Sequence, residues 1–384
     1  MTTKINNEHK KLNVPNLRFP EFQGEWKKTK FGDIATGFDY GMNAAAKNYD
    51  GVNKYIRITD IDEASSTYTD KDIVSPDGIL TDNYLVNNRD ILLARTGAST
   101  GKSYLYKKTD GKLYYAGFLI RANVTTHDPY FVFSQLHTHR YWRWVSIMSA
   151  RSGQPGINSQ EYSSFPIYTT SIEEESKIAK LLSLLDERIA TQNKIIDKLQ
   201  SLIKGIRNDV FGKLRKNIGF NAVVGDVLDY EQPQSYIVED TEYTNEGTPV
   251  LTANKAFVLG YTLETDGIYD KGDCIIFDDF TLDCKYVDFP YKIKSSAIKI
   301  LTAKNKEILR YTFEFLKYLD LSTDEHKRHY IAETQNQEFV LPTMQIVRTI
   351  AHAFSALSLR MESVVKQRNM FETQKQYLLR QMFI

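Results

Sequence analysis

Apolar residues recur at alternating steps of four and three along two stretches of the chain, residues 178–210 and 350–382. Nine of ten such positions are apolar in the first stretch and eight of ten in the second, which is the spacing of a coiled-coil seam. The pattern predicts two long helices, each about 50 Å at about 1.5 Å per residue, that pair antiparallel. A helix lying alone on the core of its own module is the alternative. The apolar seam positions are Ile178, Leu182, Leu185, Ile189, Ile196, Leu199, Ile203, Ile206, Val210, Ile350, Phe354, Leu357, Met361, Val364, Phe371, Leu378 and Met382.

The segments before the two helices resemble each other, so we predict an internal repeat of a module and a helix. The matching pairs are separated by 193, 183, 177 and 172 residues in chain order, and a shorter second copy produces such a steadily falling offset. The matches are Phe31–Ile34 with Val224–Val227, Asp90–Leu93 with Asp273–Ile276, Asp128 with Asn305, and Ile178–Ala179 with Ile350–Ala351.

Short runs of β-branched and aromatic residues between Gly, Asn and Asp turns predict that both modules consist mostly of strands. The clearest runs are residues 54–59, 90–94, 273–277 and 297–301. The predicted fold class is α+β, with an internal pseudo-two-fold repeat. Two β-rich modules, residues 1–170 and 218–342, are joined by two long helices, residues 171–217 and 343–384, which form an antiparallel coiled coil.

The net charge of +1 hides an uneven distribution. Residues 1–170 include 21 basic and 17 acidic residues, whereas residues 218–342 include 12 and 22, so a nucleic-acid ligand would have to be met by local basic faces. No stretch approaches the roughly 18 apolar residues of a membrane span, and we expect a cytoplasmic protein. Cys274 and Cys284 lack the spacing of a zinc site and are predicted to be buried thiols.

The sequence contains no intact motif for catalysis or for a metal site. The segment Gly97–Ser103 has three residues between its glycines where a phosphate-binding Walker loop has four. It is either a glycine hairpin or a loop that contacts DNA phosphates and base edges. Asp283-Cys284-Lys285 lacks the other ligands of a metal-dependent nuclease. Asp128–Tyr130 is predicted to cap a helix, and the histidine pairs His137/His139 and His326/His329 to lie on solvated or capped helix faces. The segment Arg140–Trp144 could stack on bases or clamp phosphate, but we expect its aromatic residues to pack into the module core and its arginines to point outward.

The opening segment Val14–Phe22, with Gly24-Glu25-Trp26 and Phe31–Ile34, resembles the start of the specificity subunits of bacterial type I restriction-modification systems, a bacterial defence. The chain departs from the family at Thr170, where proline is frequent, and at residues 343–348, which lack the acidic pair found at Glu174-Glu175. The junction between the family's first recognition domain and first central helix is resembled by Gly153–Asn158, Phe165–Ile167, Glu174-Glu175 and Ile178-Ala179, and Leu341-Pro342 before Ile350-Ala351 repeats it.

The resemblance implies a non-catalytic subunit that binds a split, asymmetric double-stranded DNA target and holds two methylation subunits and two restriction subunits. Residues 1–170 and 218–342 would be target-recognition domains, one per half-site, and residues 171–217 and 343–384 conserved spacer helices. The chain itself would bind no cofactor and no metal, whereas its partners use S-adenosylmethionine, ATP and Mg²⁺. A rod of about 50 Å spans about 14 base pairs of B-DNA, so the helices would set the gap between half-sites.

The candidate DNA contacts rest on side-chain chemistry alone, because recognition loops differ among members of the family. Two other classes of protein remain open: a self-sufficient DNA enzyme, which would need an intact cofactor or metal motif, and a coiled-coil adaptor that binds only proteins. The candidates are Arg57, Thr59, Arg95, Thr96, Ser99, Thr100, Lys102 and Ser103 in the first module, and Thr252, Asn254, Lys255, Lys285, Lys292, Lys294, Ser295 and Ser296 in the second.

Overall fold

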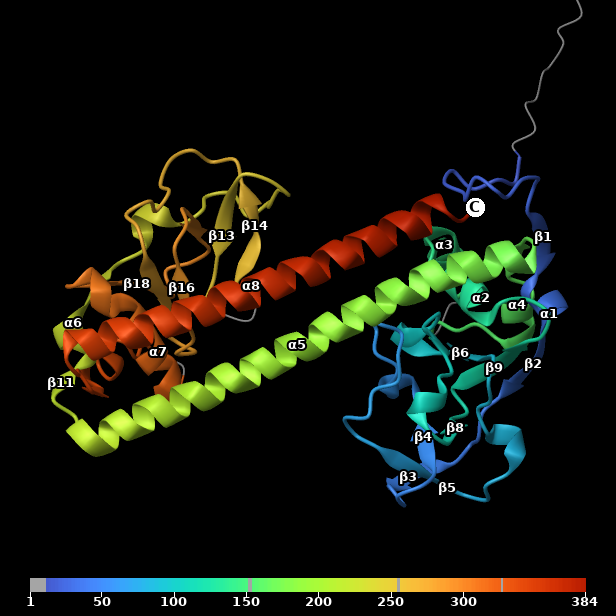
Figure 1. Ribbon diagram of the computed structural model, residues 1–384, viewed down its shortest axis with the longest axis horizontal. Coiled ribbons are helices and arrows are strands. Elements are labelled where there is room, and N and C mark those ends of the chain that lie inside the picture. Colours follow the sequence, from blue (N-terminus) through green and yellow to red (C-terminus); the bar gives the residue numbers. More distant parts are fainter. Residues whose placement is uncertain (1–11, 151–153, 254–255, 326) are drawn as a thin grey trace, which may run out of the picture. The chain divides into compact units, whose positions relative to one another are not determined.

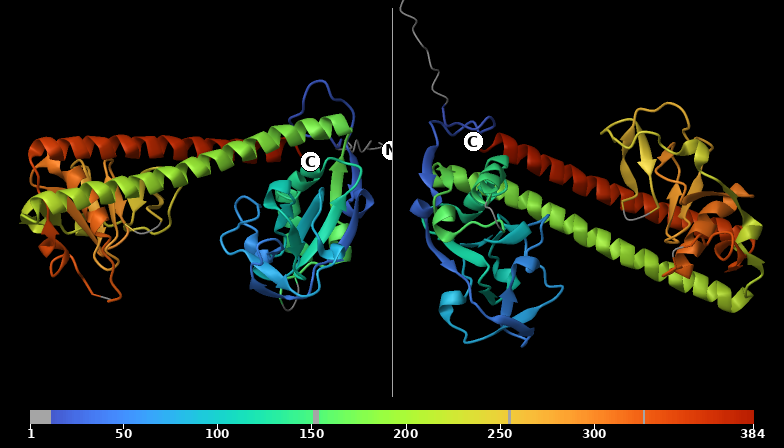
Figure 2. Two further views of the ribbon diagram at one scale, coloured as in Figure 1. Left: turned by 60° about the horizontal axis from the view of Figure 1, so that its bottom comes forward. Right: turned by 180° about the vertical axis from the view of Figure 1, so that it is seen from behind.

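The computed structural model describes residues 12–150, 154–253, 256–325 and 327–384, and its contacts divide the chain into two compact units. The first unit contains Met1–Thr191 and Arg368–Ile384, and the second contains Gln192–Gln367. Figures 1 and 2 show α5 (Ile172–Ile218) and α8 (Met344–Gln381) as unbroken helices. Each long helix therefore contributes residues to both units.

The first module is built of short strands and short helices. Its strands are β1 (Lys27–Lys30), β2 (Ala35–Tyr40), β3 (Ala45–Asn48), β4 (Lys54–Ile56), β5 (Val74–Asp77), β6 (Asp90–Ala94), β7 (Ser103–Leu105), β8 (Leu113–Tyr115), β9 (Leu119–Val124) and β10 (Pro166–Thr169). Its α-helices are α1 (Phe31–Ile34), α2 (Pro129–Gln135), α3 (His139–Met148) and α4 (Ser159–Ser163).

The second module has fewer elements. Its strands are β11 (Ala222–Val223), β12 (Leu228–Glu231), β13 (Thr248–Leu251), β14 (Val258–Thr262), β15 (Cys274–Asp278), β16 (Cys284–Val287), β17 (Lys292–Ile293), β18 (Ile298–Ala303) and β19 (Glu338–Phe339). Its α-helices are α6 (Val224–Val227) and α7 (Leu309–Leu319).

The two modules share one strand order, which confirms the predicted internal repeat. The four-stranded sheet runs β2-β9-β6-β7 in the first module and β12-β18-β15-β16 in the second. Each module adds an antiparallel pair, β1 with β10 and β11 with β19, and a parallel contact, β4 with β8 and β13 with β17. Helices α1 and α6 occupy the two segments that the sequence comparison matched first.

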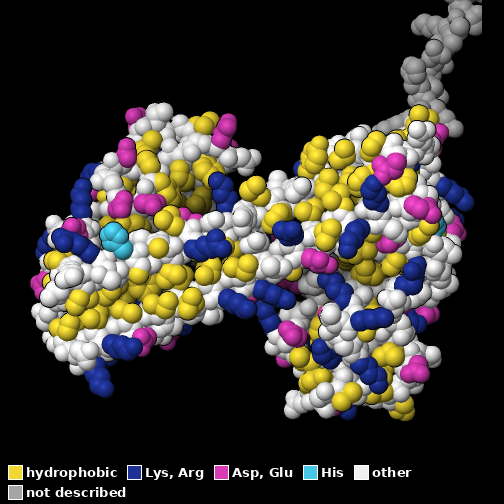
Figure 3. All heavy atoms as spheres, in the orientation of Figure 1, with side chains coloured by type: hydrophobic (Ala, Val, Ile, Leu, Met, Phe, Trp, Pro, Cys, Tyr) yellow, Lys and Arg dark blue, Asp and Glu magenta, His cyan; other side chains and the backbone are white. Residues whose placement is uncertain are grey.

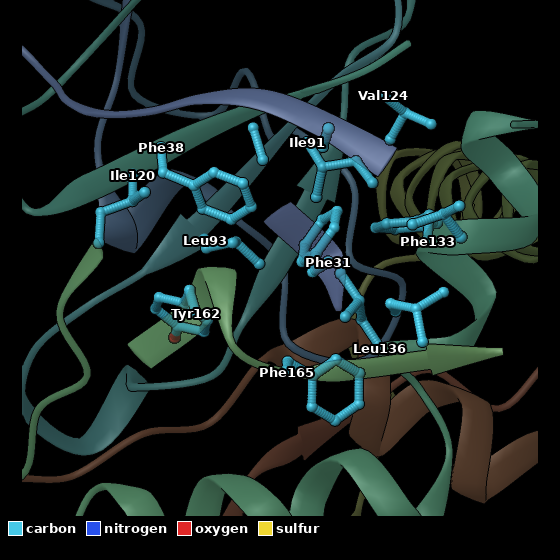
Figure 4. Close-up of a cluster of buried hydrophobic side chains, with 14 of the residues drawn as sticks. Phe31, Phe38, Ile91, Leu93, Ile120, Val124, Phe133, Leu136, Tyr162 and Phe165 are labelled. Atoms are coloured by element: carbon cyan, nitrogen blue, oxygen red, sulfur yellow. The ribbon is translucent and has the colours of Figure 1, made fainter. Parts of the chain in front are cut away.

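The sheet of the first module is covered on both faces, and all five residues of β6 are buried. Ile91 and Leu93 point into a cluster with residues of α2 and α3 (Figure 4). The alternate residues Leu92 and Ala94 pack against the β4 and β8 pair, as the two-residue period of a strand requires. Helix α2 begins at the predicted cap, because Asp128 accepts hydrogen bonds from the two amides that follow Pro129.

The core of the second module follows the same plan. Ile275 and Phe277 of β15 pack with residues of α7, and Cys274 and Ile276 pack on the other face with residues of β13 and β17. Both cysteines are buried and unbridged, as predicted. Burial raises the pKa of Cys274 to about 12 and that of Cys284 to about 11, so both stay as thiols at neutral pH.

The seam residues of α5 and α8 are all buried or half-buried. In the first unit Leu182 of α5 shares a cluster with Leu378 of α8, and Lys375 Nζ lies 2.6 Å from Asp186 Oδ1. In the second unit Ile206 packs in one cluster with Ile350. The start of α5 therefore meets the end of α8 and the reverse, so the helices run antiparallel and the predicted fold class is confirmed.

The ends of the seam also pack on the modules. Trp26 and Phe131 join the seam cluster of the first unit, and Phe211 of α5 packs edge-on against Tyr311 and Phe315 of α7 in the second. The coiled-coil interpretation of the apolar pattern is therefore confirmed, and the alternative of a helix that lies alone on its module is wrong, although the ends of the seam also pack against the module cores.

Several local predictions are wrong. The strand expected over residues 54–59 ends at Ile56, because Asp60 accepts the amide of Arg57 and closes a tight turn. Arg140 does not point outward but stacks on Phe165 and Tyr168, 5.2 and 4.7 Å from the ring centroids. His329 is buried rather than solvated, and His326 lies outside the described residues. No helix in the described part of the chain is long and apolar enough to span a membrane.

Candidate nucleic-acid interface

The strands of the first module end in a cavity of about 570 Å³. It lies where β2 ends at Tyr40, where Arg95 follows β6, and where Phe118 precedes β9. Tyr40 and Phe118 are 44% and 57% exposed at its rim. A concave, largely apolar wall with a few polar groups is typical of a binding site. The wall includes Tyr40, Met42, Tyr55, Arg57, Thr59, Arg95 and Phe118.

Helix α5 begins at the opposite end of the same strands. Ala35 at the start of β2 pairs with Val124 at the end of β9, whereas Tyr40 at the cavity end pairs with Ile120. Four residues after β9, the amide of Asp128 donates to Glu175 Oε2 at 3.0 Å. A strand of six residues is about 20 Å long, so the module presents the cavity at the end of the sheet that lies farthest from the start of α5.

Arg95 is the most available cation of this cavity. Its Nε donates to the carbonyl of Gly117 at 2.9 Å, and its guanidinium lies 4.8 Å from the ring centroid of Tyr40 and 5.7 Å from that of Phe118. The backbone of Arg95 is held as well, since its amide donates to Phe118 and its carbonyl accepts from Ile157. The side chain is therefore half-buried and oriented before any ligand binds.

Arg57 lines the same cavity but is engaged inside the module. Its Nε and Nη2 donate to the carboxylate of Asp60 at 2.9 and 2.8 Å, and Nη2 also lies 3.0 Å from Asp72 Oδ2. These bonds to two carboxylates raise the pKa of Arg57 above its ordinary value. Thr59 is exposed at the rim. Arg57 thus shapes the wall, and binding a ligand would require it to leave its carboxylates.

The segment Gly97–Ser103 is a packed hairpin rather than an open anion loop. The amides of Gly97, Thr100, Gly101 and Lys102 all donate to carbonyls of the module. Thr100 and Ser103 are buried, and Thr100 Oγ1 donates to the carbonyl of Gly97 at 2.7 Å. Lys102 Nζ pairs with Glu63 at 3.1 Å, and Thr96 and Ser99 are half-buried. Most of the backbone donors that would cradle a phosphate are therefore already used.

The candidates of the second module are scattered. Lys292 is buried, with its ammonium 2.6 Å from Glu264 Oε2 and donating to the carbonyl of Asp266. Asn254 and Lys255 lie outside the described residues. The structure places Lys294 and Ser295 on the surface, and Thr252, Lys285 and Ser296 half-buried. Among the described residues, the cavity of the first module brings together the candidates Arg57, Thr59 and Arg95.

The acidic pair at the start of α5 lies inside the first unit. Arg18 binds Glu174 through Nε and Nη2, each at 2.7 Å, and the Thr170 hydroxyl donates to Glu174 at 2.6 Å. Glu175 faces His127 Nδ1 at 2.9 Å, and burial raises the pKa of this carboxyl. The pair fixes the start of α5 to its module.

Sequence reasoning missed Tyr40 and Phe118. Each stands next to a glycine, Gly41 and Gly117, at a strand end, and this arrangement was the only local signal of an exposed aromatic turn. On the face shown in Figure 3, Lys and Arg side chains of the first module are interspersed with Asp and Glu. Among the described residues, no three His, Cys, Asp or Glu side chains are grouped to hold a metal ion.

Comparison with known proteins gives matches to proteins of type I restriction-modification systems. Residues 23–201 match the sequence model of the type I restriction modification DNA specificity domain. The type I restriction enzyme EcoR124I/EcoR124II specificity subunit of Escherichia coli is 44% identical over 126 residues, 31% of this chain and 31% of that subunit. The MjaVIII specificity subunit of Methanocaldococcus jannaschii is 26% identical over 201 residues, 51% of this chain and 44% of that subunit. The matched segments span less than half the length of these curated relatives.

The fold is also shared with a solved structure. The crystal structure of the type I restriction-modification system S subunit from M. genitalium covers 97% of this chain and 99% of its own, with a TM-score of 0.67 at 16% identity. The sequence matches and the shared fold agree with the repeat described above. The matched family model, the curated relatives and this solved structure are all of type I restriction-modification specificity subunits, and the chain is similar to them in sequence over residues 23–201 and in fold over nearly its whole length.

Proposed function

We propose that the chain recognises a split, asymmetric double-stranded DNA target, one half-site with each module. The observation that carries this proposal is the repeat of one strand order, β2-β9-β6-β7 and β12-β18-β15-β16, with different side chains at the equivalent strand ends. Two identical subunits of a dimer bind the two identical half-sites of a palindrome. Two related scaffolds with different surfaces can likewise bind two different half-sites.

In this proposal the chain itself is not an enzyme and binds no cofactor. It holds two methylation subunits, which use S-adenosylmethionine to methylate adenine, and two restriction subunits, which use ATP and Mg²⁺. The repeat of a module and a long helix supports this arrangement, because each of two identical partners can bind one copy of the repeat.

Mapping of methylated adenines tests target recognition. The chain is assembled with its methylation subunit, and random DNA is treated with the complex and sequenced for methylated positions. We expect two short conserved half-sites separated by a gap of fixed length. Absence of sequence-dependent binding in a competition assay at fixed salt would favour a protein-only adaptor. Methyl transfer by the chain alone would favour an enzyme.

The length of the seam suggests that the helices set the gap. Residues 178–210 form about 50 Å of helix, the length of about 14 base pairs. Inserting a heptad plus a four-residue stutter into both α5 and α8 should lengthen the gap and leave both half-sites unchanged. An insertion of equal length in the exposed segment 63–65 serves as control. An unchanged gap in the variant with longer helices would contradict the proposal that the helices set the gap.

A further inference from the structure

The arginines around the sheet of the first module differ in how fully their donors are used. Arg57 is bound to Asp60 and Asp72, Arg89 donates to three backbone carbonyls, and Arg121 donates to the carbonyl of Leu85 and to Asp39. The guanidinium of Arg95 has one hydrogen bond, from Nε to the carbonyl of Gly117. Neither terminal nitrogen of Arg95 is bonded to any described residue, so two parallel N–H donors remain available.

These two donors are held in a fixed direction. The bond from Nε fixes the rotation of the guanidinium, and the rings of Tyr40 and Phe118 lie against it at 4.8 and 5.7 Å from their centroids. A side chain that is already ordered loses little rotamer entropy on binding. Arg95 is therefore a preorganised fork at the rim of a cavity rather than a freely moving surface cation.

The surroundings of the fork favour a base edge over a phosphate. Phosphate sites gather several cations, hydroxyls and amides, whereas Lys102 is paired with Glu63 and Arg57 with Asp60. The cavity wall near Arg95 consists of aromatic and small apolar residues, among them Ala44, Ala116 and Phe118. In the major groove, O6 and N7 of guanine offer two acceptors that match an arginine fork, and no other base offers this pair.

We propose that Arg95, braced by Tyr40 and Phe118, reads a guanine in the half-site of the first module. This inference rests on the proposed function and adds to it a base and a set of residues. The sheet pairing aligns Ile91 and Leu93 with Ile275 and Phe277, so the position of the second module that matches Arg95 is Asp279. Its buried carboxylate accepts the amides of His329 and Tyr330 at 3.0 and 2.7 Å. The second module has no such fork there, so the guanine contact belongs to one half-site only.

The test compares Arg95→Ala and Arg95→Lys with the wild-type chain in the complete methylation complex, by mapping methylated sites in random DNA. We expect one guanine position of one half-site to become degenerate in both variants, with discrimination at that position falling roughly 10- to 100-fold. The other half-site serves as an internal control of folding and assembly. Arg143→Ala, which removes an exposed arginine of the same module, should leave the target unchanged.

Other outcomes would overturn the inference. If Arg95 contacts a phosphate, Arg95→Ala would weaken binding to all sequences alike, the salt dependence would fall by about one charge, and Arg95→Lys would restore affinity. If Arg95 only supports the fold, the target would stay unchanged while the thermal stability falls. A wild-type complex without a split target would refute the proposed function itself, whereas a split target that Arg95→Ala leaves intact refutes only the guanine contact.

Discussion

The β6–β7 hairpin of the first module and the β15–β16 hairpin of the second occupy the same place in the same sheet but differ in chemistry. The first carries Arg95, whose terminal nitrogens are free of hydrogen bonds to the described residues, and the second carries Asp279 at the matching position and Asp278 before it, whose carboxylates accept amides of their own module. One hairpin is therefore equipped to meet a ligand and the other to stabilise itself. The comparison teaches that the repeated scaffold fixes where a side chain stands, while the side chain decides whether that place contacts anything outside.

The modules also differ in how they are tied to the helices. In the first unit Arg18 binds Glu174 of α5 from the module side. In the second unit the charge is reversed, because Glu314 of α7 is buried between Arg310 and Arg207, the latter from α5. Each link joins a module to a helix through a buried carboxylate with arginine donors, so each should be sensitive to the loss of that carboxylate.

The largest effect should come from breaking the link in the second unit. Glu314→Ala leaves the guanidinium groups of Arg207 and Arg310 half-buried without their carboxylate, at a cost of about 3 kcal/mol in the free energy of unfolding. Chemical denaturation of the full chain measures it. The exposed pair of Glu307 with Arg348 is the control, and Glu307→Ala should change stability by less than about 0.5 kcal/mol. If the two substitutions had equal effects, burial of Glu314 and its arginines would contribute nothing to the free energy of unfolding.

Substitution of two glycines distinguishes the stability cost of backbone strain from that of a side-chain clash. Gly101 in the first hairpin and Gly272 before β15 have φ of +95° and +94°, but a Cβ at Gly101 would lie 2.8 Å from Val145 Cγ1, whereas none of the described atoms lies within 4 Å of a Cβ at Gly272. Gly272→Ala should cost about 1 kcal/mol from the backbone alone, and Gly101→Ala about 2 to 3 kcal/mol. Thermal melting compares them. Similar losses would show that α3 moves aside without cost.

Removing the carboxylate of the second hairpin tests its structural role. Asp278→Ala deprives two amides of their acceptor and should cost about 1 to 2 kcal/mol. Arg95→Ala in the first hairpin loses one bond to a carbonyl and should cost less. Denaturant midpoints of the two variants decide the order, with the exposed Asp288→Ala as reference. The reverse order would contradict the assignment of stability to one hairpin and of binding to the other.

The smallest effects on stability should come from two histidines whose pKa values are shifted in opposite directions. Burial lowers the pKa of His137 to about 4, with Lys375 adding to the effect, whereas the bond to Glu333 raises the pKa of His329. The stability contributed by His137 is present above about pH 6.5 and is lost as the pH falls towards 4. That of His329 is present below about pH 6.5 and is lost as the pH rises through its raised pKa. NMR titration of the two imidazoles checks both, and shifts of the same sign would contradict the assignment.

Much of the fold follows from the sequence because its signals are local. The four–three spacing gave the seam of α5 and α8, the falling offsets gave the repeat, and Asp128 before Pro129 gave the start of α2. Strand ends were less predictable. Lys54–Ile56 stops early because Asp60 caps the next turn, and a carboxylate three residues away competes with continued pairing.

Polar side chains could not be assigned in the same way. The sequence offered Arg57, Lys292 and Arg95 as equal candidates, since each is a cation in a loop-rich module. Only the tertiary structure decided among them: it brings Asp72 to Arg57 and Glu264 to Lys292, and it leaves Arg95 between two rings with free donors. The physical reason is that apolar burial follows a short period along the chain, whereas the availability of a charge depends on whether a partner from a distant segment neutralises it.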